Sequence, residues 1–493
     1  MNLRAPPLAS AWQYSEGRRA SVRSLHVLRH ILALAAALAL AATAASAQPS
    51  PTEHALLHTL AAEVSADREH ATIAKLVAFG TRHTLSDTKS ETRGIGAARR
   101  WVASQFTAMS KDCGGCLTVE TPSEMFTGRR VPNPTEVMDV LAIQKGTTDP
   151  GRVIVISGHI DSRVTDVQNF TSDAPGANDD ASGTAAVIEA ARVLSKHKFP
   201  ATLVFAVLSG EEQGLYGGHV LADYATKQGW RVEADLNNDI IGNSEGISGV
   251  RETTRVRVFS EGTKSVETAA EADRRRYNGG EVDSPSRQIA RYMDGLAGAY
   301  LGNFKVTMVY RTDRFGRGGD QTEMIKAGFP AVRVTEANEN YNRQHQDLRT
   351  ENGVKYGDVI ESVDFAYLAN VTRVNVITLA SMAMAPAPPT HVDISGAVSA
   401  DTTVKWQPAA DAARYRLWWR STTDPQWRFA REAAPSGKAV LTDVNIDDWY
   451  FGVSAVSPDG WESPVVFPGA PGSWTHEEAP PAPAAPGTPG SKP

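Results

Sequence analysis

The sequence predicts an α/β fold, a mostly parallel mixed sheet with helices on both faces, followed by a C-terminal β-sandwich. Two continuous apolar runs, 153–157 and 202–208, are typical of strands buried on both faces of a sheet. Between them, residues 185–194 have the small and apolar side chains of a buried helix. Strand, helix and strand in this order predict parallel pairing through right-handed crossovers. After residue 390, short β-branched and aromatic stretches alternate with Pro, Asp, Ser and Gly, which indicates a small sandwich.

Length and composition indicate an ordinary globular protein of more than one domain. The chain has 493 residues, of which 41% are hydrophobic and 22% charged. This length suggests roughly two or three domains. The formal net charge is −6. Nucleic-acid-binding proteins normally have a net positive charge, so we expect no nucleic-acid partner.

The N-terminal 47 residues are expected to be a signal peptide. An Ala-rich apolar run at 31–47 follows Arg23 and Arg29 and ends in the small-x-small pattern of residues 45–47. A membrane anchor is the alternative interpretation, but the run is about three residues short of a bilayer span. We therefore expect an exported protein, periplasmic or secreted, without a membrane contact after cleavage.

The two cysteines of the chain, Cys113 and Cys116, form a CxxC pair. In an oxidising compartment this spacing favours a local structural disulfide. In the cytosol it could serve redox or zinc chemistry. The chain has no second CxxC that would complete a four-cysteine zinc site.

Changes in composition predict the domain boundaries. The Pro/Ala stretch at 384–390 is expected to be a linker, and the Pro/Ala/Gly-rich tail at 470–493 is expected to be disordered. The placing of Trp406, Tyr415 and Tyr450 resembles a fibronectin type III domain. For this module we expect attachment to a substrate, surface or polymer, or a structural role. The predicted layout is a signal peptide at 1–47, an α/β domain at 48–383, the linker at 384–390, the sandwich at 391–469 and the tail at 470–493.

Polar residues follow each predicted strand of the α/β region. Because ligands in parallel sheets bind at the carboxyl ends of the strands, these side chains are expected to converge at one edge. Neighbouring carboxylates repel each other, and a dication compensates such repulsion. Imidazoles and carboxylates without thiolates suit zinc or a similar divalent ion. The residues are His159, Asp161, Asp179, Asp180, Glu211, Glu212, Asp239 and His345.

Together these segments resemble peptidase family M28, the co-catalytic zinc aminopeptidases of the bacterial leucyl type. The resemblance covers about residues 53–381, and the motifs occur in the family's order. The motifs are GHIDS at 158–162, GANDDASG at 176–183, EEQG at 211–214, NDIIG at 238–242 and the late His345.

The resemblance implies two Zn²⁺ per chain and a role for each motif residue. One zinc is bound by His159 and Asp239, the other by Glu212 and His345, and Asp179 bridges them. Glu211 is the general base for a water activated by the metals. The remaining implied residues are Asp161, which orients His159, Asp180, whose peptide bond with Asp179 is expected to be cis, and Tyr310, the nearest candidate for a tyrosine that assists the oxyanion.

The implied function is an exported metallo-exopeptidase acting on peptides or proteins, with an aminopeptidase favoured. The alternatives are an M20-type or carboxypeptidase-like zinc amidohydrolase, a one-zinc glutaminyl cyclase and a non-catalytic binding protein on the same scaffold. The long gap between Asp239 and His345 would leave room for an M20-type dimerisation domain. Its charged stretch at 251–276 is expected to be a solvated helix or an insertion near the cleft.

Overall fold

The computed structural model describes residues 52–474. The predicted signal peptide and the tail from residue 475 onward lie outside the described residues. Across residues 52–474, no helix is both long enough and apolar enough to span a bilayer.

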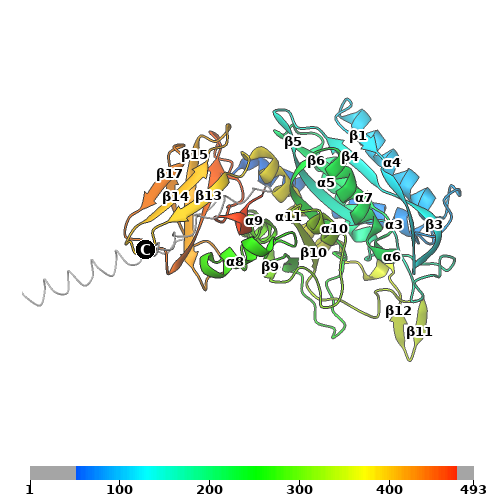
Figure 1. The fold of residues 1–493 in the computed structure, drawn as a ribbon. Coiled ribbons are helices and arrows are strands. Elements are labelled where there is room, and N and C mark those ends of the chain that lie inside the picture. Colours follow the sequence, from blue (N-terminus) through cyan, green and yellow to red (C-terminus); the bar gives the residue numbers. More distant parts are fainter. Residues whose placement is uncertain (1–51, 475–493) are drawn as a thin grey trace, which may run out of the picture. The chain divides into compact units, whose positions relative to one another are not determined.

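The central element is an eight-stranded sheet in the order β1-β4-β6-β5-β7-β10-β8-β9 (Figure 1). Its middle strands β6, β5, β7 and β10 are parallel, whereas β4 and β8 join them antiparallel. The mixed, mostly parallel sheet predicted from the sequence is therefore confirmed. The strands are β1 (Thr118–Glu120), β4 (Val140–Gln144), β5 (Asp149–His159), β6 (Ala201–Leu208), β7 (Arg231–Asn238), β8 (Arg255–Phe259), β9 (Lys305–Val309) and β10 (Ala331–Glu336).

Helices cover both faces of this sheet. One face carries α2 (Ala55–Glu63), α3 (Ala66–Val77), α4 (Gly94–Asp112), α5 (Ala181–Leu194), α9 (Pro285–Tyr300) and α11 (Phe365–Met384). The other face carries α7 (Tyr216–Lys227) and α10 (Gln321–Lys326). The further helices are α6 (Glu211–Gly214), α8 (Ala269–Asn278), η1 (Ile360–Ser362) and η2 (Ala470–Gly472).

The apolar run of β6 shows why a strand between two helical layers has no polar alternation. Leu203, Phe205 and Val207 pack into the core on the α5 side. The residues between them pack into the core on the α7 side. Because successive side chains of a strand point to opposite faces, both sets must be apolar when both faces are covered.

The region between Asp239 and His345 belongs to the central sheet. β8, β9 and β10 all pair within it, so no separate dimerisation domain is inserted. The charged stretch at 251–276 is therefore only partly the solvated helix that we expected. α8 has no buried residue, but β8 pairs with β10, and its Val256 and Val258 are fully buried.

Two hairpins extend from the α/β domain. The first pairs β2 (Ser123–Gly128) with β3 (Val131–Met138), and the second pairs β11 (Arg349–Glu351) with β12 (Val354–Tyr356). Figure 1 shows the β11–β12 hairpin projecting from the body of the domain.

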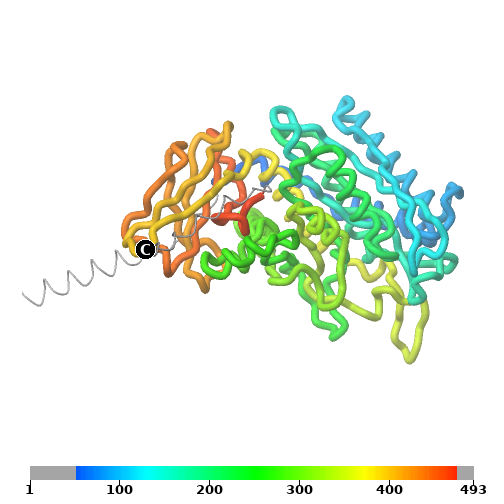
Figure 2. Tube along the Cα trace, in the orientation of Figure 1, coloured from blue at the N-terminus to red at the C-terminus, as the bar shows by residue number. Residues whose placement is uncertain are grey.

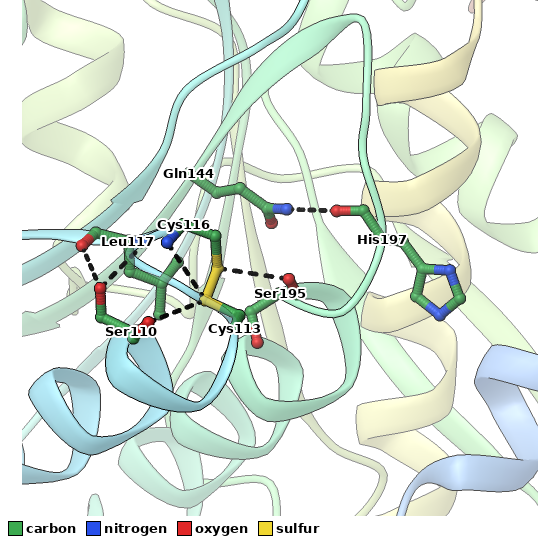
Figure 3. The surroundings of a disulfide bond; sticks show 7 residues. All are labelled: Ser110, Cys113, Cys116, Leu117, Gln144, Ser195 and His197. Carbon is green, nitrogen blue, oxygen red and sulfur yellow. Dashed lines mark hydrogen bonds between the residues drawn. A yellow bond between two sulfur atoms is a disulfide. The ribbon is translucent and has the colours of Figure 1, made fainter.

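Cys113 and Cys116 are bonded to each other at the end of α4 (Figure 3). The hydroxyl of Ser110 donates to the carbonyl of Leu117 at 2.6 Å across the same turn. The disulfide therefore closes the turn that leads from α4 into β1.

The C-terminal strands form two three-stranded antiparallel sheets, β13-β14-β17 and β16-β15-β18, traced in yellow to red in Figure 2. Their shared core contains Val404, Tyr415, Leu417 and Phe451. The likeness to a fibronectin type III domain stays a prediction. The strands are β13 (Thr390–Ser395), β14 (Thr402–Gln407), β15 (Arg414–Ser421), β16 (Phe429–Ala433), β17 (Lys438–Leu441) and β18 (Trp449–Val456).

The segments expected to be a linker and a disordered tail are packed where the structure describes them. α11 ends at Met384 and β13 begins at Thr390, and most residues between them are buried. Residues 470–472 form η2, and the indole of Trp474 donates to the carbonyl of Glu233 at 2.9 Å. The first residues of the predicted tail are therefore packed, held by Trp474 and by Lys264, whose Nζ donates to the carbonyls of Ala470 and Ser473.

Candidate metal centre

The motif residues gather at the carboxyl end of β5, where the chain order of the sheet reverses direction. From β5 the chain crosses to β6 on one side through α5, and then returns past β5 to β7 on the other side. Such a switch point leaves a crevice between the diverging loops. His159 is the last residue of β5, and Asp239 directly follows β7.

Five of the predicted residues form two three-residue sets that share Asp179. His159, Asp179 and Asp239 make up the first set, and Asp179, Glu212 and His345 make up the second. In each set, the ligand atoms offered all lie within 4.8 Å of one another. One oxygen of Asp179 lies 3.2 Å from Nε2 of His159, and the other lies 2.9 Å from Nε2 of His345. Asp179 therefore faces both sets at once.

Buried polar contacts hold the loop that carries Asp179. The backbone N–H of Asp179 donates to Oδ2 of Asp358 at 2.7 Å. The peptide bond between Asp179 and Asp180 is cis. The carboxylate of Asp180 accepts from the backbone N–H groups of His159, Gly183 and Ile240 at 2.9–3.1 Å. Asp180 thus ties the ends of β5 and β7 to the start of α5.

Asp161 connects His159 with the glutamate pair. Its Oδ1 lies 3.5 Å from Nδ1 of His159. Its two oxygens also accept from the backbone N–H groups of Glu211 and Glu212 at 3.3 and 3.2 Å, and from the hydroxyl of Thr84 at 2.8 Å. Asp161 is fully buried. It therefore fixes the imidazole and the start of α6 in one arrangement.

Glu211 begins α6, immediately after Gly210, whose φ of 77° lies in the left-handed region. This conformation favours glycine and turns the chain sharply at the end of β6. Glu211 is half-buried beside the two sets. Burial raises its pKa to about 8, and the carboxylates of Asp239 and Glu212 act in the same direction.

The donor atoms fit divalent cations. Nε2 of His159 and Oε1 of Glu212 are buried, and their polar neighbours at 3.2 and 2.9 Å are other members of the ligand sets that do not form a hydrogen bond with them. Unsatisfied buried polar atoms are costly unless another partner is present. Since both atoms point into the ligand sets and no thiolate is near, imidazole nitrogen and carboxylate oxygen would hold a borderline ion such as zinc.

Two arginines, the half-buried Arg163 and the fully buried Arg333, flank the sets and were missed in the sequence. Nε of Arg163 donates to Oε2 of Glu212 at 2.8 Å. Nη1 of Arg333, on β10, forms an ion pair with Oδ2 of Asp239. Burial alone would raise the pKa of Asp239, but Arg333 and His159 hold it below its usual range. The available signals were the position of Arg163 directly after the GHIDS motif and a charge at Arg333 within an apolar strand.

Tyr310 lies elsewhere, so the structure does not bring this candidate to the cluster. It follows β9, which runs opposite to β7 because β9 is parallel to β8, β8 is antiparallel to β10, and β10 is parallel to β7. Two strands, β10 and β8, separate β9 from β7. The ring of Tyr310 packs beneath the guanidinium of Arg287, whose central carbon is 3.9 Å from the ring centroid.

The chain is similar to known proteins over the region that contains these residues. The profile of peptidase family M28 matches residues 139–363. A probable zinc metalloprotease of Pyrenophora tritici-repentis is 46% identical over 426 residues, which are 85% of this chain and 88% of the relative. One of Pyricularia oryzae is 42% identical over 419 residues, 82% of this chain and 83% of the relative.

Solved structures with a related fold include the LapA aminopeptidase of Legionella pneumophila, with a TM-score of 0.46 and 19% identity, covering 67% of this chain and 75% of that chain. A glutaminyl cyclase of Porphyromonas gingivalis has a TM-score of 0.44 and 16% identity, covering 64% of this chain and 98% of that chain. The family profile and the identity to the two metalloproteases over more than four-fifths of the chain show that this protein belongs to peptidase family M28.

Proposed function

We propose that the protein is an exported zinc metallo-exopeptidase that uses two Zn²⁺ to remove N-terminal residues from peptides. The observation that carries this proposal is the pair of ligand sets joined by Asp179, with Glu211 beside both. The first set would hold one ion through His159 and Asp239, and the second would hold the other through Glu212 and His345.

Zinc in these sets would supply Lewis acidity, polarising the scissile carbonyl and lowering the pKa of an attacking water. Glu211 accepts the proton of that water as its oxygen adds to the carbonyl carbon. The carbon–nitrogen bond then breaks, and Glu211 returns the proton to the leaving amine. Asp161 holds Glu211 in place for both transfers through the backbone N–H at the start of α6.

Export rests on two features. The sequence of residues 1–47 has the order of charged, apolar and small residues that typifies a signal peptide. The disulfide between Cys113 and Cys116 suits an oxidising compartment. N-terminal sequencing of the mature protein from its native host tests this part, and a first residue near Gln48 is expected.

The test of the chemistry is Glu211→Gln, which keeps the shape of the side chain and removes the proton acceptor. We expect turnover of an amino-acid amide to fall about 10²–10⁴-fold, the range for loss of a general base. Zinc content should stay at two ions per chain. Glu91→Gln is the matched control, since Glu91 is an exposed side chain outside the cluster. Full turnover of Glu211→Gln with two zinc ions bound would refute the mechanism.

A separate panel of peptides and amides with free or blocked termini tests the substrate class. An aminopeptidase cleaves amides and peptides with a free N-terminus and leaves N-acetylated ones intact. Release of C-terminal residues from N-blocked peptides would instead support the carboxypeptidase-like alternative. One zinc per chain together with cyclisation of N-terminal glutamine would support a cyclase, and metal without any turnover would support a binding protein.

The M20-type alternative is disfavoured because β8, β9 and β10 complete the central sheet in the region where a second domain would stand. For the sandwich we propose a structural role, since its β16-β15-β18 sheet packs against the catalytic domain through Arg420 and Trp427. Contact with a surface or polymer through the sandwich stays a prediction.

A further inference from the structure

The three carboxylate ligands of the proposed centre use their oxygens in different ways. Asp179 directs one oxygen to each histidine. Asp239 directs Oδ1 toward His159, at 3.9 Å from Nε2, and its Oδ2 is paired with Arg333. Glu212 directs Oε1 toward Nε2 of His345 at 2.9 Å, and its Oε2 accepts from Nε of Arg163. Each terminal carboxylate therefore has an inner oxygen that faces the ligand set and an outer oxygen that an arginine holds.

The two arginines are themselves held in place. Arg333 is fully buried, and its guanidinium also reaches the carbonyls of Gly318 and Asp239 at 3.4 Å. The side chain of Arg163 is 15% exposed, and its Nη1 donates to the carbonyl of Val164 at 3.2 Å. Nη2 of Arg163 lies 2.6 Å from Nδ1 of His345. Arg163 therefore contacts only second-set ligands, and Arg333 contacts only a first-set ligand.

We propose that Arg163 and Arg333 are positioning residues, each of which fixes the outer oxygen of one terminal carboxylate and so governs ion binding in its own ligand set. This inference rests on the proposed function, because it assumes that both sets bind zinc. A carboxylate can otherwise rotate and offer either oxygen or both to an ion. A charge-assisted hydrogen bond to the outer oxygen leaves one oxygen in one orientation. Partners of this kind commonly contribute 10–100-fold to metal affinity.

Position and charge make opposite predictions, which allows a sharp test. A guanidinium is a positive charge next to a cation site, so its electrostatic effect alone opposes ion binding. If charge dominated, Arg163→Met would bind zinc more tightly than the wild type. If position dominates, the same substitution weakens binding. Arg163→Lys keeps the charge but loses the planar fork, so it should also weaken binding, by less than Arg163→Met.

The experiment measures zinc per chain by native mass spectrometry over a series of buffered free-zinc concentrations, without reference to activity. We expect two binding steps in the wild type. In Arg163→Met, one step should weaken about 10–100-fold and the other should stay unchanged. Arg373→Met is the matched control, because Arg373 is also half-buried and hydrogen-bonded but lies on α11, away from the cluster.

Single-set backgrounds assign the affected step. Asp239→Ala leaves only the second set complete, and His345→Ala leaves only the first. Adding Arg163→Met should weaken the one remaining step in the Asp239→Ala protein and leave it unchanged in the His345→Ala protein. Adding Arg333→Lys should do the reverse. Lysine is used here because Arg333 is fully buried and its charge must be kept for folding.

The outcomes separate the two proposals. A wild-type chain that binds fewer than two zinc ions contradicts the proposed function. Two ions in the wild type, with both steps unchanged, tightened or equally weakened in Arg163→Met, overturn the positioning role while leaving the proposed function in place. The Arg163 arm decides the matter even where a variant of Arg333 fails to fold.

Discussion

Two buried clusters of charged side chains in this protein have opposite charge balances. One has an excess of carboxylates, and the other has an excess of arginines. At the metal centre, six carboxylates stand against the guanidinium groups of Arg163 and Arg333. At the contact with the sandwich, which we call the interface cluster, Asp283 pairs with Arg291 and Arg420, and the carboxylates of Asp283 and Glu261 both act on Arg287. The carboxylates of the metal centre are Asp161, Asp179, Asp180, Glu211, Glu212 and Asp239.

In the interface cluster the chain's own groups pair the carboxylate of Asp283, although Nη1 of Arg287 and Nε of Arg420 are buried without a hydrogen bond to a described residue. Asp283 accepts from Arg420 through both oxygens at 2.8 and 2.9 Å and from Arg291 at 3.0 Å. The rings of Trp427 and Tyr450 lie 5.2 and 4.8 Å from the guanidinium of Arg420 and offer their negative faces. The metal centre has no such compensation for its excess of anions. One cluster therefore needs cations from outside, whereas the other joins two domains by itself.

The largest effect is expected from Asp179→Asn, which breaks the residue shared by both ligand sets. Turnover should fall by more than about 100-fold, since changes in partners of metal ligands alone cost 10–100-fold. The midpoint of thermal unfolding of the metal-free protein should change little, because repulsion among carboxylates is reduced. Paired measurements of kinetics and melting check this. If the metal-free Asp179→Asn protein melted well below the metal-free wild type, the metal centre would not have an excess of negative charge.

The complementary change at the interface cluster is Asp283→Asn, for which stability and not turnover should respond. Removing one partner of a buried ion pair typically costs about 3–5 kcal/mol, because the arginines are left without compensation. Thermal unfolding should shift to lower temperature, while kcat for an amino-acid amide at a permissive temperature stays unchanged. Asp166→Asn, in an exposed loop, is the control. A loss of turnover in fully folded Asp283→Asn would show that the two clusters are coupled.

The same contrast explains what could be predicted from the sequence. The ligand residues directly follow strands whose apolar runs are conspicuous, so their convergence needs only the parallel order of β5, β6 and β7. Arg333 pairs with Asp239 across 94 residues, and Asp358 holds the Asp179 loop from 179 residues away. The sequence around Arg333 and around Asp358 gives no indication of these partners.

The direction of the strands β8 and β9 is the second feature that could not be predicted from the sequence. Val256 and Val258 alternate with arginines in β8, so its mixed composition indicated a solvated segment although one face of the strand is buried. Without β8, the direction of β9 cannot be inferred from the sequence, which leaves Tyr310 as only the nearest candidate for the tyrosine that the family resemblance implies. Residues 470–474 are held by the side chain of Trp474 and by the distant Lys264, although the composition of this segment otherwise indicates disorder.

Glu69 is a buried carboxylate that belongs to neither the metal centre nor the interface cluster. No basic side chain lies within hydrogen-bond distance of it among the described residues. Glu69 accepts from the hydroxyl of Thr372 at 2.5 Å, and its other oxygen has no hydrogen bond to a described residue. Burial raises its pKa from 4.5 to about 8. Between these values the folded protein binds more protons than the unfolded chain, so this contribution to stability is complete below pH 4.5 and is lost as the pH rises through 8.

Glu69→Gln should remove that dependence. The variant and the wild type should melt at similar temperatures at pH 5, and at pH 8 the variant should be more stable, by on the order of 2–4 kcal/mol. Thermal melts over pH 5–9 check this, with Glu91→Gln as the control for an exposed glutamate. Parallel pH profiles of Glu69→Gln and the wild type would show that Glu69 is ionised in the folded protein.

The smallest effect is expected from Tyr310→Leu, at the edge of the interface cluster. Tyr310 is 45% exposed and lies under the guanidinium of Arg287 at 3.9 Å. Loss of a cation–π contact at a partly exposed position costs about 0.5–1 kcal/mol, so only a small decrease in melting temperature is expected. Because the ring of Tyr310 packs on Arg287 and two strands separate β9 from β7, kcat and KM should both remain at the wild-type values. A tenfold decrease in kcat with unchanged stability would instead place the Tyr310 hydroxyl on the reacting carbonyl, and would require the Tyr310 side chain to leave Arg287 when substrate binds.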